Sequence, residues 1–248
     1  MDVETTISYL YDGQGSEIAA SEDNLLHPQA NADAAESHTV TVKDGRAMGA
    51  ADPTAIAAAK EALLEGCGYF LASHPSAVTD WYDETQVSEI YYAEAAALVQ
   101  QIFGPAAHVL PGSGHILRDE KPLIRDAALQ APALSVHNDF APSYVKNFES
   151  NAMMGPMLKT HRLVCLNLWR SIAETPMVRM PLALCDRRSI VPEDVRPVVL
   201  GPGGTAGGHE IMVGSFSPAH EWVYFPKLTK DEVISPQFPN LRKGDVNM

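Results

Sequence analysis

The chain has 248 residues, 46% of them hydrophobic, with 18 Lys and Arg against 31 Asp and Glu, for a net charge of −13. That charge disfavours binding to nucleic-acid phosphates and to anionic membrane surfaces. No basic and apolar leader opens the sequence, and no uncharged apolar stretch is long enough to cross a bilayer. We therefore expect one cytoplasmic domain over residues 1–248, without nucleic-acid or membrane partners.

The N-terminal part, residues 1–105, is expected to form an arm followed by helices. Residues 11–37 are polar and lack periodicity, which indicates a loop or a covering arm. The alternating run 38–42 and the Asp-Gly turn signal after it predict a short strand or hairpin.

Two helices are predicted in this part, each from an apolar stripe and a boundary signal. Residues 53–66 begin with an Asp-Pro pair and end at Gly66, as is typical of helix termini. Residues 83–103 carry apolar side chains at helical spacing and are stopped by Gly104 and a proline. We expect both helices to pack outside a β core.

From residue 106 the pattern changes to short strand-like runs separated by Pro, Gly and Asp. Eight such runs are predicted near residues 107–110, 114–118, 134–139, 162–170, 181–186, 195–200, 209–216 and 221–226. This spacing favours a sandwich or jelly roll. The predicted fold is therefore mainly β with flanking α-helices, with its β core at 106–226 and a C-terminal segment at 227–248.

The three cysteines are Cys67, Cys165 and Cys185, an odd number with wide spacing. The sequence has no Cys-x-x-Cys pair of the kind used in zinc or redox sites. We expect reduced, mostly buried thiols.

The most informative short motif is His137-Asn138-Asp139. In an extended strand residues i and i+2 share a face, so the imidazole and the carboxylate can reach one ion. Two histidines and one carboxylate on one face of the ion leave open positions, as in Fe(II) oxygenases. Chance alone predicts about one His-x-acid pair in such a composition, so a surface pair in a turn is the alternative.

A third ligand has to come from elsewhere in the fold, and three histidines compete for the position. His209 follows a Gly-rich segment, His161 opens a predicted strand, and His220 lies between the last two predicted strands.

Four ordered blocks of sequence resemble one family of bacterial and fungal oxygenase-like proteins. The blocks are His137–Pro142, Leu166–Ile172, Pro181–Ser189 and His220–Pro226, followed by Asp231-Glu232. The family includes the cephamycin 7-methoxylation component, gibberellin-desaturase-like proteins and fungal meroterpenoid endoperoxidases. The resemblance covers roughly residues 110–235.

This resemblance implies a double-stranded β-helix that binds Fe(II) and 2-oxoglutarate and oxidises a small secondary metabolite with O₂. It also implies that His220 is the third iron ligand beside His137 and Asp139. Family members tend to carry Arg-Trp-Tyr-Tyr after this histidine, whereas this chain has Glu-Trp-Val-Tyr, and the sequence after Glu232 differs as well. These departures leave the metal ligands intact and the substrate undefined.

Two cations are candidates for the distal carboxylate of 2-oxoglutarate. Arg170 ends the apolar run 162–170 on the face shared by its even-numbered residues, and a buried guanidinium needs an anionic partner, ideally in a bidentate pair. A structural ion pair with Asp186 is the alternative. Lys230 lies ten residues after His220, in a sequence that resembles a helix capping box, which favours solvent exposure. Asn167 has no role here beyond a hydrogen bond.

The sequence therefore predicts a non-haem Fe(II)/2-oxoglutarate-dependent dioxygenase. Hydroxylation, desaturation, rearrangement and endoperoxidation all remain open, as does a homodimer or a heterodimer with a paralogue. Two other classes compete with the enzyme. One is a non-catalytic or weakly active jelly-roll subunit that supports a paralogous oxygenase. The other is a zinc hydrolase that uses the same triad with a bound water.

Overall fold

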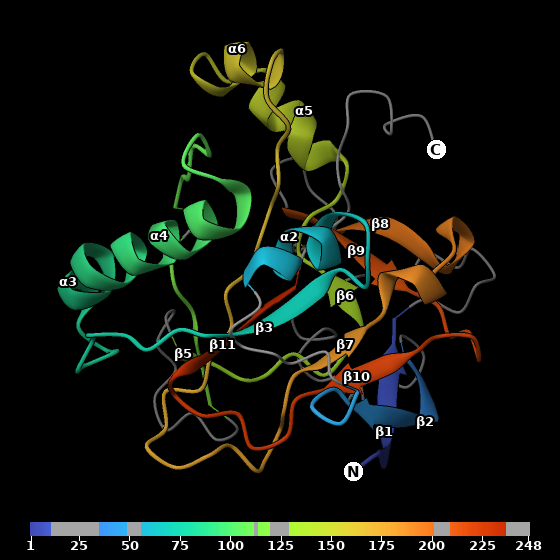
Figure 1. Ribbon diagram of the computed structural model, residues 1–248. Coiled ribbons are helices and arrows are strands. Elements are labelled where there is room, and N and C mark those ends of the chain that lie inside the picture. The colour runs from blue at the N-terminus through green and yellow to red at the C-terminus, as the bar shows by residue number, and fades with distance from the viewer. Residues whose placement is uncertain (11–34, 49–55, 112–113, 120–128, 201–208, 237–248) are drawn as a thin grey trace.

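The computed structural model describes residues 1–10, 35–48, 56–111, 114–119, 129–200 and 209–236 (Figure 1). Within these ranges the largest sheet has four strands, in the order β1-β2-β10-β7. These strands are β1 (Val3–Tyr9), β2 (Glu36–Asp44), β10 (Trp222–Tyr224) and β7 (Ala183–Cys185). The first and last quarters of the chain therefore lie side by side, in blue and red-orange in the figure.

A second sheet carries the His-x-Asp motif. It has the order β6-β9-β8, from β6 (His137–Asn138), β9 (His209–Gly214) and β8 (Val195–Leu200). Both contacts are antiparallel, and His137 is the partner of Val213. Two smaller pairs complete the described sheets: β3 (Tyr69–Ser73) with β11 (Glu232–Pro236), and β4 (Leu117–Arg118) with β5 (Leu129–Gln130).

The β core is larger than the segment 106–226 expected from the sequence. Strand β2 pairs in parallel with β10, and β3 pairs antiparallel with β11, so the first hundred residues supply strands to two sheets. The run 107–110 forms no strand. The missed strand β3 is almost fully buried and short, and such an apolar run has no alternation to distinguish it from a loop or helix.

The helix predicted at 83–103 is confirmed. It comprises α3 (Glu84–Gln86), a π-helical turn (Val87–Tyr91) and α4 (Tyr92–Phe103), with Asp83 as N-cap. Helix α2 (Ile56–Leu64) is confirmed from Ile56 onward, whereas its predicted start at Asp52-Pro53 lies outside the described residues. Short 3₁₀ turns span Arg187–Ser189 and Pro192–Asp194.

Two further helices follow the His-x-Asp motif directly and were not predicted. These are α5 (Ser143–Glu149) and α6 (Met154–Leu158), which pack on each other at one end of the molecule (Figure 1). They are short, and the glycine and proline inside α6 hide a helical pattern.

The segment 162–170 lies beside β11, although only isolated bridges form there instead of the predicted strand. The amide of Trp169 donates to the carbonyl of Ile234 at 2.8 Å, and the reverse bond has the same length. Leu166 and Leu168 pack against the buried cluster of α2, α4, β3 and β11. Trp169 packs against a different cluster, which confirms the predicted alternation of side chains along this run.

The three cysteines are free, and burial raises the pKa of Cys165 and of Cys185 to about 11. None of the three forms a disulfide, and each is half-buried, which is more exposed than the mostly buried thiols expected from the sequence. In the part of the chain that the structure describes, no helix is long and apolar enough to span a membrane.

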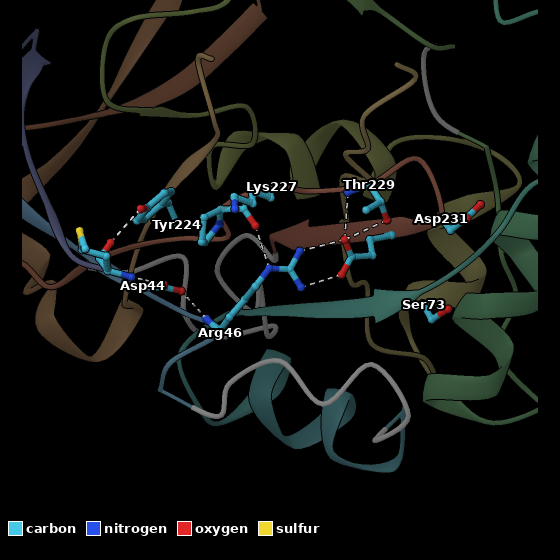
Figure 2. Close-up of a pocket in the computed structure, with 10 residues that line it drawn as sticks. Asp44, Arg46, Ser73, Tyr224, Lys227, Thr229 and Asp231 are labelled. Atoms are coloured by element: carbon cyan, nitrogen blue, oxygen red, sulfur yellow. Dashed lines mark hydrogen bonds and ion pairs between the residues drawn. The ribbon is translucent and has the colours of Figure 1, made fainter. Parts of the chain in front are cut away.

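A partly buried ion pair ties the end of β2 to β11 (Figure 2). Arg46 donates to both carboxylate oxygens of Glu232, at 2.7 and 2.8 Å, and to the carbonyl of Pro226 at 2.8 Å. The Glu232 side chain is only 14% exposed. Burial raises the pKa of Glu232, but the bonds from Arg46 and Thr229 outweigh burial, so the pKa lies below its usual value.

We expect Glu232→Gln to lower the free energy of unfolding by about 1–3 kcal/mol at pH 7, because a charge-assisted pair is lost. The folded-state pKa is depressed, so this stability is present above the unfolded value near 4.3 and is lost as pH falls through the folded value. Urea denaturation of both proteins from pH 7 down to about pH 2, which covers the range below the unfolded pKa, measures the difference. Glu174→Gln, which removes an exposed pair with Lys230, is the control and should change little. A difference independent of pH would contradict the assignment.

Candidate metal centre and anion site

His137 and Asp139 lie together, as the motif predicted. His137 Nε2 is 3.4 Å from Asp139 Oδ1. Two ligands at right angles, each about 2.1 Å from one ion, stand about 3 Å apart, so the spacing fits a shared metal. His137 Nδ1 is 2.8 Å from the carbonyl oxygen of Ser135. Because a carbonyl only accepts, Nδ1 carries a proton, and Nε2 is the ring nitrogen on the side of Asp139.

The carboxylate of Asp139 is held by a residue to which the sequence assigned no specific role. The side-chain amide of Asn167 donates to Asp139 Oδ2 at 2.6 Å, while Oδ1 faces His137. Burial raises the pKa of Asp139, but the interactions with His137, Asn167 and Arg118 outweigh burial, so the pKa lies below its usual value. The ionised form, which is the form that binds metal, is therefore favoured.

His220 does not join this pair in the structure. Its Nε2 is 3.1 Å from Asp194 Oδ2, and its side chain is only 5% exposed. The ring stacks on Tyr9 with 6.2 Å between centroids and stands edge-on to Trp222 at 6.5 Å. Its Nδ1 is buried and makes no hydrogen bond with the described residues.

Strand alternation explains the separation. Val136 packs in the same apolar cluster as Tyr9 and Trp222, the two rings that contact His220. The next side chain along an extended segment points to the opposite side, so His137 faces away from that cluster. The predicted three-ligand site is thus assembled only in part.

Of the other two histidines considered for the third position, His161 does not complete the site, and the side chain of His209 lies outside the part of the structure that is described. His161 is exposed, and its Nδ1 lies 2.9 Å from the hydroxyl of Thr160. His209 opens β9 opposite Leu200. Among the described residues, no group of three or more His, Cys, Asp or Glu side chains is arranged to hold a metal ion.

The guanidinium of the half-buried Arg170 lies against two aromatic rings. Its guanidinium carbon lies 5.2 Å from the centre of the Trp81 ring and 4.9 Å from that of Tyr91. Its Nη2 donates to His74 twice, to Nδ1 and to the backbone oxygen, each at 2.7 Å. Nε and Nη1 are buried and make no hydrogen bond with the residues that the structure describes.

The alternative partner for Arg170 is excluded by the geometry. Asp186 accepts instead from Arg188, whose Nε and Nη2 lie 2.9 and 2.5 Å from its two oxygens. Lys230 is 48% exposed and pairs with Glu174 at 2.6 Å. The expected helix cap around Lys230 is wrong, because Glu232 bonds back to Thr229 but begins a strand. The exposure expected for Lys230 is confirmed.

One large cavity connects the two sites. His137, Asp139 and Asn167 line it, and so do Arg170 and Tyr91, whereas His220 is not among its lining residues. Asn167 and Arg170 differ in parity along their shared segment, so the metal-binding pair and the cation approach this cavity from opposite faces of that segment.

Comparison with known proteins identifies the family. The family described as "Oxidoreductase/YMDC permease-like domain" matches residues 8–237. The chain belongs to this family. Its curated relatives include "Hydroxylase/desaturase efuI" of Hormonema carpetanum, 33% identical over 62% of this chain and 58% of that protein. Another is "Fe(II)/2-oxoglutarate-dependent dioxygenase nvfI" of Aspergillus novofumigatus, 29% identical over 61% of this chain and 53% of that protein.

The resemblance to the family with fungal meroterpenoid oxygenases is thus confirmed. This chain spans less than two thirds of the length of these two relatives. Its structure matches that of the "iron and alpha-ketoglutarate-dependent endoperoxidase NvfI" with a TM-score of 0.73 and 22% identity, over 95% of this chain and 83% of the other. The two chains share a fold, which is mainly strands with a few helices.

Proposed function

We propose that this oxidoreductase-family chain is a non-haem Fe(II)/2-oxoglutarate-dependent oxygenase that acts with O₂ on a small secondary metabolite. In this proposal its sheets form the core of a double-stranded β-helix. The names of two curated relatives, a hydroxylase/desaturase and a dioxygenase, support the reaction class. The observation that carries the proposal is the pair of His137 and Asp139, whose Nε2 and Oδ1 lie 3.4 Å apart and whose Nδ1 and Oδ2 are held by Ser135 and Asn167.

The donor set fits the implied iron at two of the three protein positions. His137 Nε2 and the ionised carboxylate of Asp139 lie about as far apart as neighbouring ligands of one ion, and binding of the metal would displace any proton on Nε2. Ser135 and Asn167 act as the outer partners that fix ring and carboxylate, as around most protein metal sites. Bound Fe(II) and 2-oxoglutarate would supply the activation of O₂.

Binding and orientation of 2-oxoglutarate would depend on the protein's own side chains. Arg170 would bind the distal carboxylate of 2-oxoglutarate, because a buried guanidinium with two unpaired nitrogens calls for an anion. Trp81 and Tyr91 exclude water from that cation and so strengthen the pairing. Both fork edges of a guanidinium include Nη2, which His74 occupies, so we propose a contact through Nε or Nη1 in place of the bidentate pair expected from the sequence.

The third ligand in this proposal is His220. Its Nδ1 has no hydrogen-bond partner in the described residues, and a carboxylate on Nε2 is the usual outer partner of a metal-bound histidine. To reach the ion, the segment that carries His220 has to move from its place against Tyr9 and Trp222.

We expect His220→Ala to remove most of the bound iron, while His161→Ala and His209→Ala retain it. Metal analysis after loading with Fe(II) under anaerobic conditions gives the stoichiometry for each variant. Succinate formed from 2-oxoglutarate in air should follow the same order. If His220→Ala binds a full equivalent of iron and either His161→Ala or His209→Ala loses it, the third ligand is the histidine whose removal abolishes iron binding.

A further inference from the structure

His74 follows β3 directly and is fixed on three sides. Its backbone amide donates to the carbonyl of Asp231 at 2.7 Å. Its ring nitrogen Nδ1 accepts from Arg170, and Nε2 lies 3.3 Å from the backbone oxygen of Glu94 on α4. The ring also stands 6.4 Å from that of Tyr91. The imidazole therefore connects α4 to the segment of Arg170.

These partners define the chemical form of the ring. A guanidinium has only N–H donors, so Nδ1 of His74 must offer a lone pair. A carbonyl oxygen only accepts, so Nε2 carries the single proton and donates to Glu94. Burial, followed by the positive charge of Arg170, lowers the pKa of His74, in keeping with the neutral ring that the hydrogen bonds require.

Glu94, whose backbone oxygen contacts His74, uses its side-chain carboxylate for other hydrogen bonds. Glu94 accepts from the hydroxyl of Ser76 at 2.6 Å and from the amide of Ala77 at 2.8 Å. It therefore braces the loop after β3, and its hydrogen-bond donors in the described part of the chain are Ser76 and Ala77 rather than Arg170. Arg170 keeps a buried positive charge that calls for an anion from outside the described residues.

We infer that His74 is the positioning residue of this anion site. As a neutral acceptor it holds Arg170 through Nη2, with the guanidinium against Trp81 and Tyr91 and with Nε and Nη1 left for a ligand carboxylate. The inference rests on the proposed function only for the identity of that ligand, 2-oxoglutarate. Without the acceptor, the long arginine side chain would adopt several rotamers, and each binding event would have to order it again.

Isothermal titration calorimetry with 2-oxoglutarate on the Fe(II)-loaded, anaerobic protein, and with succinate on the metal-free protein, tests this role. His74→Phe keeps a ring and removes the acceptor, and should weaken both affinities by roughly 10–100-fold, as losses of orienting groups do. His74→Asn places a carbonyl oxygen near the position of Nδ1 and should restore most of the affinity. Thermal melting and iron content should remain close to wild type in both variants.

The Arg170→Ala background provides the second control. His74→Phe should have no further effect on affinity there, because the residue that it positions is absent. Unchanged affinity in His74→Phe, an equal loss in His74→Asn, or a wild-type protein that binds neither acid would overturn the inference. Succinate binding that depends on His74, without any binding of 2-oxoglutarate, would support the inference and reject the proposed cosubstrate.

Discussion

Replacement of Asp139 by alanine is expected to remove most of the bound iron and all turnover. The carboxylate is the only anionic ligand in the proposed site, and its oxygen stands 3.4 Å from the His137 nitrogen that shares the ion. Loss of an outer partner alone typically costs about 10–100-fold in metal affinity, so loss of the ligand should cost more than about 100-fold. Competition with a chromophoric chelator under anaerobic conditions measures the affinity.

Asn167→Ala is the matched control, because it removes only the amide that bonds to Asp139 Oδ2. It should weaken iron binding within that roughly 10–100-fold range and leave the stoichiometry at saturation unchanged. Equal iron affinity in Asp139→Ala and in the wild type would show that the metal, if it binds at all, lies elsewhere.

Replacement of Arg170 by alanine is expected to weaken 2-oxoglutarate binding by about 2–5 kcal/mol, the cost of removing one partner of a buried charge pair. Iron content should change little, because Arg170 contacts His74, Trp81 and Tyr91 and neither of the proposed ligands His137 and Asp139. Calorimetric titration of the iron-loaded protein with 2-oxoglutarate measures the loss.

Lys230→Ala provides the comparison, because the ammonium group is exposed and paired with Glu174. Its affinity for 2-oxoglutarate should match the wild type. Two results would contradict the assignment: affinity that survives Arg170→Ala but collapses in Lys230→Ala, or an unfolded Arg170→Ala protein, which would make the arginine a structural residue.

The helix at 83–103 and the His137-Asp139 pair were predictable because each depends on local spacing. A regular apolar stripe predicts a helix face, and an i, i+2 pair shares one side of an extended chain. The inward direction of the Arg170 side chain was predictable for the same reason. Arg170 is an even-numbered position of this segment, like Leu166 and Leu168, which pack in the core.

The features that sequence reasoning missed depend on contacts between distant segments. Strand β3 is a buried apolar run, and its partner β11 lies about 160 residues away. The hydrogen bond from Arg170 to His74 joins residues 96 positions apart, and neither residue type alone indicates it. Asn167 lies in a block that resembles the family, yet its bond to Asp139 required the fold.

The position of His220 was also not predictable from the sequence, because it depends on how distant segments pack. The family block predicted a ligand, but a block of sequence does not specify which side of a sheet its histidine reaches. In the structure Val136 packs in the apolar cluster whose Tyr9 and Trp222 rings contact His220, and His137 points to the opposite side of its strand.

The most direct test of the central claim is the visible absorption of the protein after anaerobic addition of Fe(II) and then 2-oxoglutarate. Chelation of iron by the keto acid gives a weak charge-transfer band, which requires the metal and the cosubstrate to share one site. We predict that the band saturates at one equivalent of each in the wild type, needs far more 2-oxoglutarate in Arg170→Ala, and is absent in Asp139→Ala. A wild-type protein that binds Fe(II) and 2-oxoglutarate without the band, or a band that persists in Asp139→Ala, would contradict the proposed site.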